Sequence, residues 1–367
     1  MYTYLEKEIL QELDFFYYYP NKGNLGDLLI AEATRQFFRR NGKLFKEYDP
    51  DVPPVSDTEY TLILGGGGLS SLWGGGDTFA KHLTAPQVKQ GIVLAHSFHD
   101  VDSFIQCMDE RHTLICREKT SYAHCLSLHP KARILMGHDM ALLWKPGETY
   151  PVTNTDEKTP NTIMEEQEQY NMLQKGWEHR VIKGVKNSVV TSNGEKIAFL
   201  LRTDKEKVTS LSSPYSYDIS VSYSSSCRET KYTARFIDTF AKALSYPDTI
   251  VTDRLHVAIM AHILGKKVYL IDNDYGKLSG VYEYSLLEAE NVHVLTGNQL
   301  TPDLQKAWNK LHNRFFSLFR KKALTEREYH DRVHQNRIKK TKRMVRFSFG
   351  KRKVYYIKKL NKLLNQE

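Results

Sequence analysis

The stretch "TIVTDRLHVAIMAHILGKKVYLIDN" (residues 249–273) contains one complete strand–helix–strand unit. Short apolar runs at 249–252 and 266–273 enclose a helix that we expect over residues 254–264, with Gly265 as its stop signal. Short apolar runs of this kind are typical of strands that are buried on both faces. Two such strands joined by a helix predict a parallel sheet and an α/β fold.

The same alternation of strand and helix fills two parts of the chain. The first set of expected strands, interrupted by helices such as 27–42, comprises residues 13–19, 60–68, 91–96, 112–118 and 132–139. The second set, with a helix at 231–246, comprises residues 196–202, 217–223, 249–252, 266–273 and 291–297. We therefore expect two Rossmann-like, doubly wound halves.

A polar stretch with Pro146, Pro151 and Pro160 separates the two sets, so we place a domain boundary there. We expect an N-terminal domain over residues 1–150 and a polar linker or insertion, with a helix near 162–176, over residues 151–195. A C-terminal domain follows over residues 196–300, and a basic helical tail over residues 301–367.

The basic charge of the chain lies in the expected tail. Residues 301–367 hold 20 Lys and Arg against 5 Asp and Glu, whereas the first 300 residues hold 32 against 38. Residues 336–364 mix cations with apolar side chains on one helical face, which is typical of segments that bind an anionic membrane surface. Nucleic-acid binding is a less favoured alternative, and a helix packed on the body is a third.

Composition sets further expectations. An apolar fraction of 41% and a charged fraction of 26% are typical of a globular protein. The four cysteines form no CxxC pair, and neither a secretory signal nor an apolar membrane span is present, so we expect a cytoplasmic protein, with a peripheral position on the membrane as an alternative. The His and acidic residues lack metal-ligand spacing, and we expect no metal and no cofactor.

Ligands of parallel sheets bind beyond the carboxyl ends of the strands, and the conspicuous residues lie there. Gly23, Asn24 and Asp27 follow the first strand, where Asp27 is expected to cap the next helix, although a plain strand–helix turn would have the same pattern. The segment 65–76 has seven glycines but no GxGxxG spacing, which indicates either a close backbone approach or a flexible loop.

Two arginines and a histidine follow strands of the second set. Arg202 ends one strand, and a surface pair with Asp204 is its simplest alternative role. Asp253, Arg254 and His256 occupy the start of the helix quoted above, where a cation opposes the helix dipole, so we infer that an anionic ligand offsets it.

The loop 272–282 follows the next strand. Lys277 and Ser279 are suited to hold phosphate oxygens, and Tyr275 is suited to stack on a sugar ring.

The segments "GNLGD" (23–27), "LGGGG" (64–68), "LLRTDKE" (200–206), "TDRLHVAIMAHILGK" (252–266) and "DNDYGKLSGVY" (272–282) together resemble the polysaccharide pyruvyl transferase family, over about residues 15–285. The resemblance implies a GT-B-like fold and a reaction that moves the pyruvyl group of phosphoenolpyruvate, the co-substrate, onto two hydroxyls of a sugar with release of phosphate. We expect a lipid-linked surface-polysaccharide precursor as the acceptor.

The resemblance also implies that Arg254 and His256 lie in the donor site, that Arg202 is a second anion-binding arginine and that the loop 23–27 faces the cleft. Together with the residue chemistry above, this gives the following expected roles. Arg202, Arg254, Lys277 and Ser279 would bind phosphoenolpyruvate, and Gly23, Asn24 and Tyr275 would face the acceptor. His256 would be the catalytic acid, Asp27 the base, and Asp139, at another strand end, a lesser candidate base. A glycosyltransferase of the same fold that uses a nucleotide sugar, and a non-catalytic protein that binds a membrane or nucleic acid through its tail, are the alternatives.

Overall fold

The computed structural model describes residues 10–54, 58–72, 74, 76–148, 150, 158–204, 206–207, 211, 213–272, 276–295 and 299–320, and the single residues 334, 335, 338, 341 and 361. The side chains of Lys277 and of residues 315–320 are outside this description. Residues 1–311 form one compact unit and residues 312–367 form a second. The predicted domain boundaries near residues 150 and 195 both fall within the first unit, and they remain predictions.

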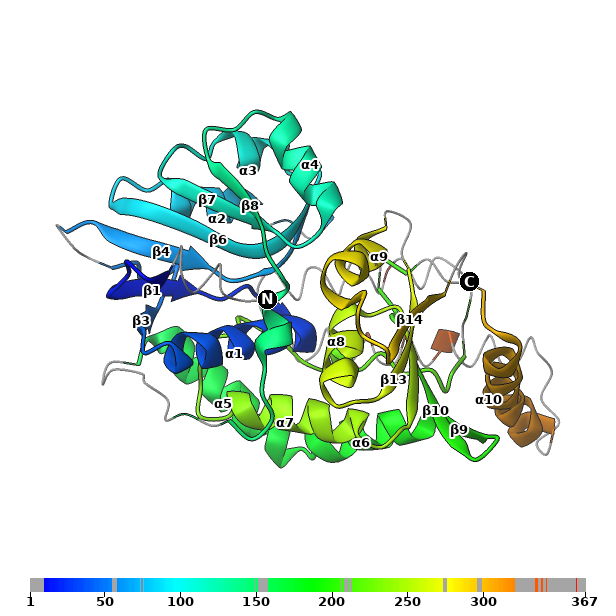
Figure 1. Ribbon diagram of the computed structural model, residues 1–367. Helices are drawn as coiled ribbons and strands as arrows, with labels where there is room; N and C mark the ends of the chain where they lie inside the picture. The colour runs from blue at the N-terminus through cyan, green and yellow to red at the C-terminus, as the bar shows by residue number, and fades with distance from the viewer. Residues whose placement is uncertain are drawn as a thin grey trace. The chain divides into compact units, whose positions relative to one another are not determined.

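The first sheet has seven parallel strands, in the order β3-β1-β4-β6-β7-β8 with β5 beside β6 (Figure 1). Its strands are β1 (Phe15–Tyr19), β3 (Leu44–Glu47), β4 (Tyr60–Leu64), β5 (Gly67–Ser70), β6 (Val88–His99), β7 (His112–Cys116) and β8 (Arg133–Met136). The strand order reverses direction at β1 and β4, as in doubly wound sheets, where ligands bind beside the reversal. This half therefore matches the prediction.

Helices cover both faces of the first sheet. They are α1 (Leu25–Arg40), α2 (Gly76–Leu83), α3 (Asp102–Gln106), α4 (Lys119–Ser127) and the 3₁₀ turn η2 (Met140–Leu143). The helix α1 is buried along thirteen of its sixteen residues, because the second half of the unit packs on its other side.

The second sheet has the order β14-β13-β12-β10-β9, with parallel pairs throughout except the antiparallel β9–β10 hairpin. Its strands are β9 (Val189–Ser192), β10 (Glu195–Leu200), β12 (Thr249–Thr252), β13 (Lys267–Ile271) and β14 (Val292–Leu295). This order has no reversal among the described strands, so the prediction of a second doubly wound sheet is wrong. The predicted strand at 217–223 is also wrong, because the 3₁₀ turn η3 (Ser220–Ser222) occupies it.

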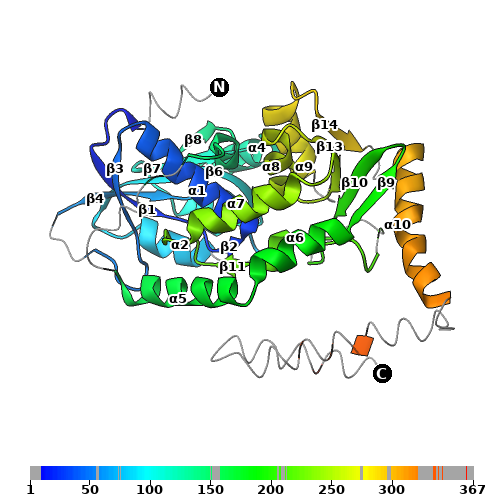
Figure 2. The ribbon, with the colours of Figure 1, turned by 90° about the horizontal axis from the view of Figure 1, so that it is seen from below.

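The stretch expected to be a polar linker is structured from residue 158 onward. It forms α5 (Pro160–Gln174), α6 (Trp177–Asn187) and the edge strand β9 (Figure 2). Trp177 is buried against Phe236 of α7 (Thr233–Leu244), at a ring-centroid distance of 4.4 Å. The expected helix near 162–176 is therefore present as α5, and α6, which follows it, packs into the core of the second half.

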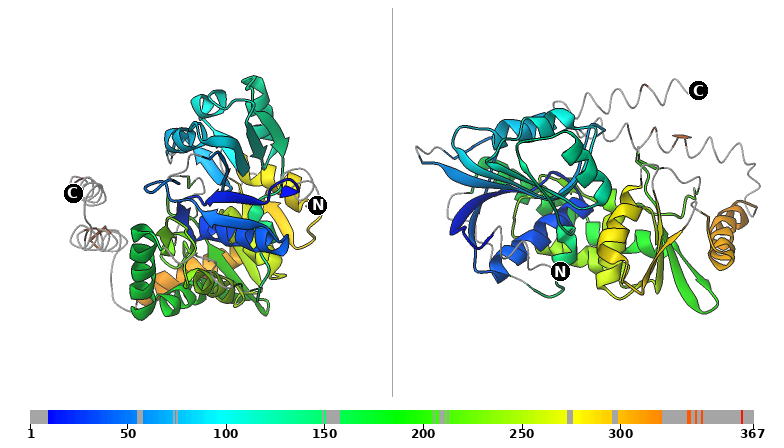
Figure 3. Two further views of the ribbon diagram at one scale, coloured as in Figure 1. Left: turned by 90° about the vertical axis from the view of Figure 1, so that its left-hand side faces the viewer. Right: turned by 45° about the horizontal axis from the view of Figure 1, so that its top comes forward.

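One hydrophobic cluster joins the two sheets. It runs from Phe16 of β1 through α1 and η2 to α7 and to α8 (Leu255–Ile263), and it continues through Leu270 of β13 to Val292 of β14. Figure 3 shows the two sheets as separate layers with these helices between them. Because α1 packs directly on α7 and α8, the carboxyl ends of β1 and β12 are held close together.

The remaining elements are short or lie near the tail. They are β2 (Gly23–Asn24), β11 (Ser224–Ser225), α9 (Lys277–Val281), the π-helical turn η4 (Tyr282–Leu286) and α10 (Pro302–Arg320). The predicted membrane-binding segment 336–364 lies almost wholly outside the described residues. Within the described part of the chain, no helix combines the length and the apolar character needed to cross a bilayer.

Candidate active site

A cavity of about 590 Å³ lies at the carboxyl ends of strands from both sheets. Its charged lining residues come from both halves of the unit and are Lys22, Asp27, Arg117, Arg202, Asp204, Glu206, Arg254 and His256. A cavity of this volume accommodates a ligand of several dozen atoms, so it has room for more than a three-carbon phosphate ester.

The "GNLGD" corner forms one side of the cavity. Asn24 caps α1: its side-chain Oδ1 accepts the N–H of Gly26 at 2.8 Å, and Oδ2 of Asp27 accepts the N–H of Asn24 at 2.8 Å. Asp27 is thus the third helical residue of a capping box whose N-cap is Asn24. The prediction from the sequence that Asp27 itself is the N-cap is wrong. A Cβ on Gly23 would lie 2.9 Å from Asp27 Cβ and closer still to its carboxylate, so glycine is required there.

The corner is completed by an antiparallel pair between β2 and β11, in which Ser224 lies opposite Asn24. This pair ties the first-sheet corner to the segment that precedes α7.

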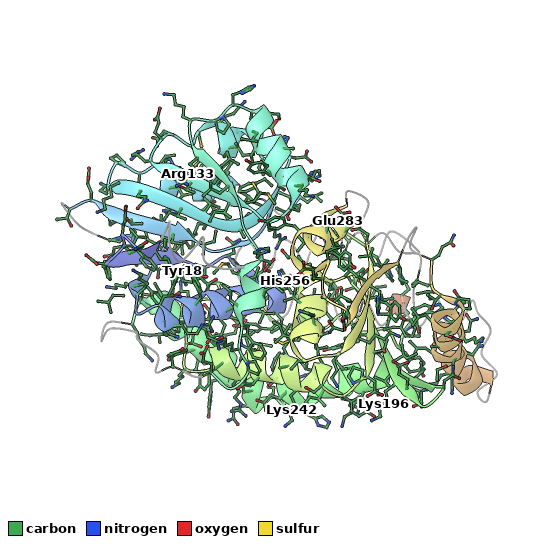
Figure 4. The ribbon with its side chains drawn as sticks, in the orientation of Figure 1. Tyr18, Arg133, Lys196, Lys242, His256 and Glu283 are labelled. Atoms are coloured by element: carbon green, nitrogen blue, oxygen red, sulfur yellow. The ribbon has the colours of Figure 1, made fainter. Side chains whose placement is uncertain are left out.

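Gly26 lies against the imidazole of His256. A Cβ at residue 26 would be 2.8 Å from Cγ and 2.9 Å from Cβ of His256, and closer still to Nδ1. Carbon atoms prefer separations of about 3.5–4.0 Å, so no larger residue fits without displacing the ring. Gly26 of the first half and His256 of the second half are therefore in direct contact, and Figure 4 shows His256 beside α1.

A buried acid supports the other side of the imidazole. His256 Nε2 lies 3.4 Å from Oδ2 of Asp139, and the same oxygen accepts Nη1–H of Arg117 at 2.6 Å. Burial alone would raise the pKa of Asp139, but the charges of His256 and Arg117 hold this pKa well below its usual range. Asp139 is fully buried and is not among the cavity-lining residues, so its geometry fits a positioning residue for His256 better than a base.

Arg254 is held by two carboxylates. Its Nε and Nη2 donate to Oδ1 and Oδ2 of Asp218 at 3.1 and 2.6 Å, and Nη2 lies 2.6 Å from Oδ2 of Asp204. Burial opposes the charge of Arg254, but these two carboxylates raise its pKa above the ordinary value. The guanidinium is therefore fixed in direction, and its Nη1 has no carboxylate partner among the described residues.

Arg202 has a similar arrangement at the end of β10. Its Nε lies 2.9 Å from Oδ1 of Asp204 and its Nη2 lies 2.6 Å from Oε2 of Glu206. Burial alone would raise the pKa of Asp204, but Arg254 and Arg202 hold this pKa below its usual value. The pairing of Arg202 with Asp204 was the simpler alternative from the sequence, but both arginines are only 6% exposed and line the cavity, so the pair is not a surface feature.

Asp253 has a structural role. Its Oδ1 accepts the backbone N–H of Arg202 at 2.7 Å and joins the ends of β10 and β12, and burial raises its pKa. The three polar residues at the start of α8 thus face three different groups: Asp253 faces backbone, Arg254 faces carboxylates and His256 faces Asp139 and Gly26.

The glycine-rich segment packs backbone against its surroundings, as one of the two expectations had it. A Cβ on Gly66 would be 2.7 Å from the carbonyl oxygen of Ala95, and one on Gly67 would be 2.9 Å from Nδ2 of Asn21. Gly68 and Gly74 line the cavity.

The loop 272–282 contributes less than predicted. Leu278 lines the cavity, whereas the hydroxyl of Ser279 donates to the carbonyl of Gly276 at 3.0 Å and Ser279 is not a lining residue. Tyr275 and the side chain of Lys277 lie outside the described residues. Among the residues that are described, no group of three or more His, Cys, Asp or Glu side chains could hold a metal ion.

Sequence reasoning missed several contributors to the cavity, among them Tyr19, Lys22, Phe79 and Arg117. Tyr19 and Arg117 directly end or follow β1 and β7, so the rule that pointed to Arg202 and Arg254 would also have found them. Lys22 is exposed at the cavity and has no ion-pair partner among the described residues. Nothing in the sequence pattern singles out Phe79.

Comparisons with known proteins agree with this geometry. The sequence profile of polysaccharide pyruvyl transferases matches residues 24–275, more than half of the chain. The chain belongs to the polysaccharide pyruvyl transferase family. Membership of this family indicates a pyruvyl transferase of polysaccharide biosynthesis, which is the family expected from the sequence.

Two further similarities accompany this polysaccharide pyruvyl transferase match, one to a curated protein and one to a solved structure that bears on the fold alone. EpsO of Bacillus subtilis (strain 168), which carries an assignment as a pyruvyl transferase, is 24% identical over 274 residues, covering 71% of this chain and 81% of EpsO. The crystal structure of a functionally uncharacterized protein of Klebsiella pneumoniae subsp. pneumoniae NTUH-K2044 aligns with a TM-score of 0.58 at 24% identity, covering 78% of this chain and 93% of that protein.

Proposed function

We propose that the cavity binds phosphoenolpyruvate and transfers its pyruvyl group to two hydroxyls of one sugar, which forms a cyclic ketal and releases phosphate. The observation that carries the proposal is the convergence of Arg202, Arg254 and a carboxylate-supported His256 on one cavity. This convergence supplies anion recognition and a proton donor at the same place.

Phosphoenolpyruvate carries a carboxylate and a phosphate close together, so it requires at least two cationic contacts. Arg202 and Arg254 each have Nε and Nη2 engaged by carboxylates, which leaves Nη1 for the ligand. Each charge-assisted hydrogen bond to such a ligand is worth about 1.5–3 kcal/mol. Lys22 adds a charge that no described carboxylate neutralises.

The reaction begins with a proton transfer from His256 to the methylene carbon of the donor. The electron pair of the double bond forms the new C–H bond, which leaves C2 cationic, and the first sugar hydroxyl attacks C2 and loses its proton. The C2–O bond to phosphate then breaks, phosphate leaves with its bonding electrons and a proton, and the second hydroxyl closes the ring. The two protons that the sugar hydroxyls lose therefore balance the proton gained by the methylene carbon and the proton that leaves with phosphate.

Asp139 determines which nitrogen of His256 takes part. Because the carboxylate lies beside Nε2, it orients the ring and leaves Nδ1 to exchange the proton. Asp27 lines the cavity beside Gly26 and is our candidate for the base that accepts the hydroxyl proton. Its capping bond to the N–H of Asn24 fixes the carboxylate at the acceptor side.

We further propose that the acceptor is a lipid-linked saccharide and that residues 336–364 bring the protein to an anionic membrane. The excess of Lys and Arg in this segment supports the idea, since each basic residue near such a surface contributes about 1 kcal/mol. Co-sedimentation with vesicles that contain anionic lipid, with and without residues 336–367, tests it. Equal binding of both proteins would refute it.

The experiment for the proposed reaction incubates the full-length protein with phosphoenolpyruvate and a panel of glycan acceptors. We expect phosphate release that depends on the acceptor, and a glycan whose mass increases by one pyruvate ketal. Parallel reactions with nucleotide sugars are the control. Transfer from a nucleotide sugar, with none from phosphoenolpyruvate, would replace the proposal by a glycosyltransferase.

A further inference from the structure

We propose that Tyr19 and Phe79 form the wall on which the ring of the acceptor sugar binds. The proposal rests on the proposed function, since it assigns the second substrate of that reaction to one side of the cavity. Neither aromatic residue is among the acceptor contacts predicted from the sequence.

The wall is built from two elements of the first half and is held rigidly. Tyr19 ends β1 and Phe79 lies in α2, and their rings meet edge to face with centroids 5.4 Å apart. Tyr48 and His82 pack on Tyr19 at 5.2 and 5.8 Å, and the Tyr48 hydroxyl is hydrogen-bonded to Nδ1 of His82 at 2.8 Å. Three neighbours thus fix the Tyr19 ring while it still lines the cavity.

The chemistry of the wall suits a sugar better than the donor. A pyranose ring has an apolar face of C–H groups, which an aromatic ring covers favourably, and polar edges that need hydrogen bonds. The donor is a small trianion, for which the cations of the second sheet, Arg202 and Arg254, are the better partners. The paired arginines of the lining therefore come from the second half, whereas the two aromatic residues come from the first half, which also contributes Lys22 and Arg117.

Asn21 offers a hydrogen-bonding group next to this wall. It lines the cavity, is only 7% exposed, and uses Nδ2 on the carbonyl of Gly66 at 3.0 Å. Its Oδ1 is buried and has no hydrogen-bond partner among the residues that the structure describes, and buried acceptors are seldom left in that state. A sugar hydroxyl bound beside Tyr19 would supply the missing donor after a small movement of the amide.

The test replaces the rings while keeping apolar bulk, with Tyr19→Leu and Phe79→Leu in the full-length protein. Tyr19→Phe retains the ring, and Tyr17→Leu is the matched control, because Tyr17 packs on the same Tyr48 ring but does not line the cavity. The Michaelis constants for phosphoenolpyruvate and for the acceptor are measured separately. Saturation-transfer NMR measures binding of the methyl glycosides of galactose, mannose and N-acetylglucosamine without any donor.

We expect both leucine variants at the wall to raise the acceptor KM about three- to tenfold and to weaken the NMR signal. The donor KM should stay within about twofold, and Tyr17→Leu should resemble the unaltered protein. Tyr19→Phe keeps the ring and should therefore raise the acceptor KM less than Tyr19→Leu does. An unchanged acceptor KM, a raised donor KM in its place, or absence of NMR transfer to all three glycosides would overturn the proposal. If phosphoenolpyruvate is not the donor, phosphate release is absent but the NMR signal and its loss in Tyr19→Leu persist, so the two failures are distinguishable.

Discussion

Replacing Gly26 by alanine directly tests the contact between Gly26 of the first half and His256 of the second half. The added methyl carbon would lie 2.8 Å from Cγ of His256, whereas the optimal separation of two non-bonded carbon atoms is about 3.5–4.0 Å. The imidazole ring must therefore move away by about 1 Å. A displacement of that size at a catalytic group costs on the order of 100-fold in rate. Overpacking also costs about 1–3 kcal/mol of stability, partly offset because alanine favours a helix by about 1 kcal/mol.

The assay for Gly26→Ala is steady-state phosphate release, with a urea denaturation curve to confirm the fold. Gly76→Ala is the matched control: it also lies at the start of a helix, but its Cβ would meet Phe104 and Val101 at the ordinary distances of 3.7 and 3.9 Å. We expect the control to retain full activity. A folded Gly26→Ala protein with a turnover within about threefold of normal would refute the contact with His256 as a determinant of catalysis.

Three further predictions follow from the ion pairs and from burial. Asp139→Asn leaves the buried Arg117 without its full charge partner, so urea denaturation should show a loss of about 3–5 kcal/mol, and an unchanged midpoint would contradict the pair. Arg254→Lys loses the two-bond contact with Asp218 and should raise the donor KM roughly 10- to 100-fold while the acceptor KM is kept, which phosphate-release kinetics measures. Burial raises the pKa of Tyr19 to about 12, whereas a tyrosine in the unfolded chain ionises near pH 10. The free energy of unfolding should therefore fall as the pH rises from about 10 to about 12. The Tyr19→Phe protein, which lacks this ionisable hydroxyl, should show a smaller decline.

The parts of the fold that depend on local pattern could be predicted from the sequence. The runs around residues 249–273 have strand and helix patterns with clear ends, and β12, α8 and β13 occupy them. The segment 217–223 also alternates, but it turns as η3, because Asp218 accepts the N–H of Thr203 at 2.8 Å and binds Arg254. These tertiary bonds outweigh the strand preference of the pattern.

The site could be predicted only in part. The strand-end rule identified Arg202, Arg254 and His256, since the carboxyl ends of parallel strands share one edge. It could not show that Asp204 and Asp218 hold Arg254, nor that Gly26 lies against the imidazole, because those contacts join residues far apart in the chain. The pair of Arg202 with Asp204 is local, and it was already an alternative from the sequence. The contact of Gly26 with His256 arises from the packing of α1 on α8, which no local pattern specifies.

The most direct test of the central claim is the mass spectrum of the glycan product formed from phosphoenolpyruvate in heavy water. If His256 exchanges its proton with solvent and delivers it to the methylene carbon, the new methyl group carries one deuterium, and the His256→Asn protein makes no product. A ketal without deuterium, or an equal yield from His256→Asn, would contradict the account.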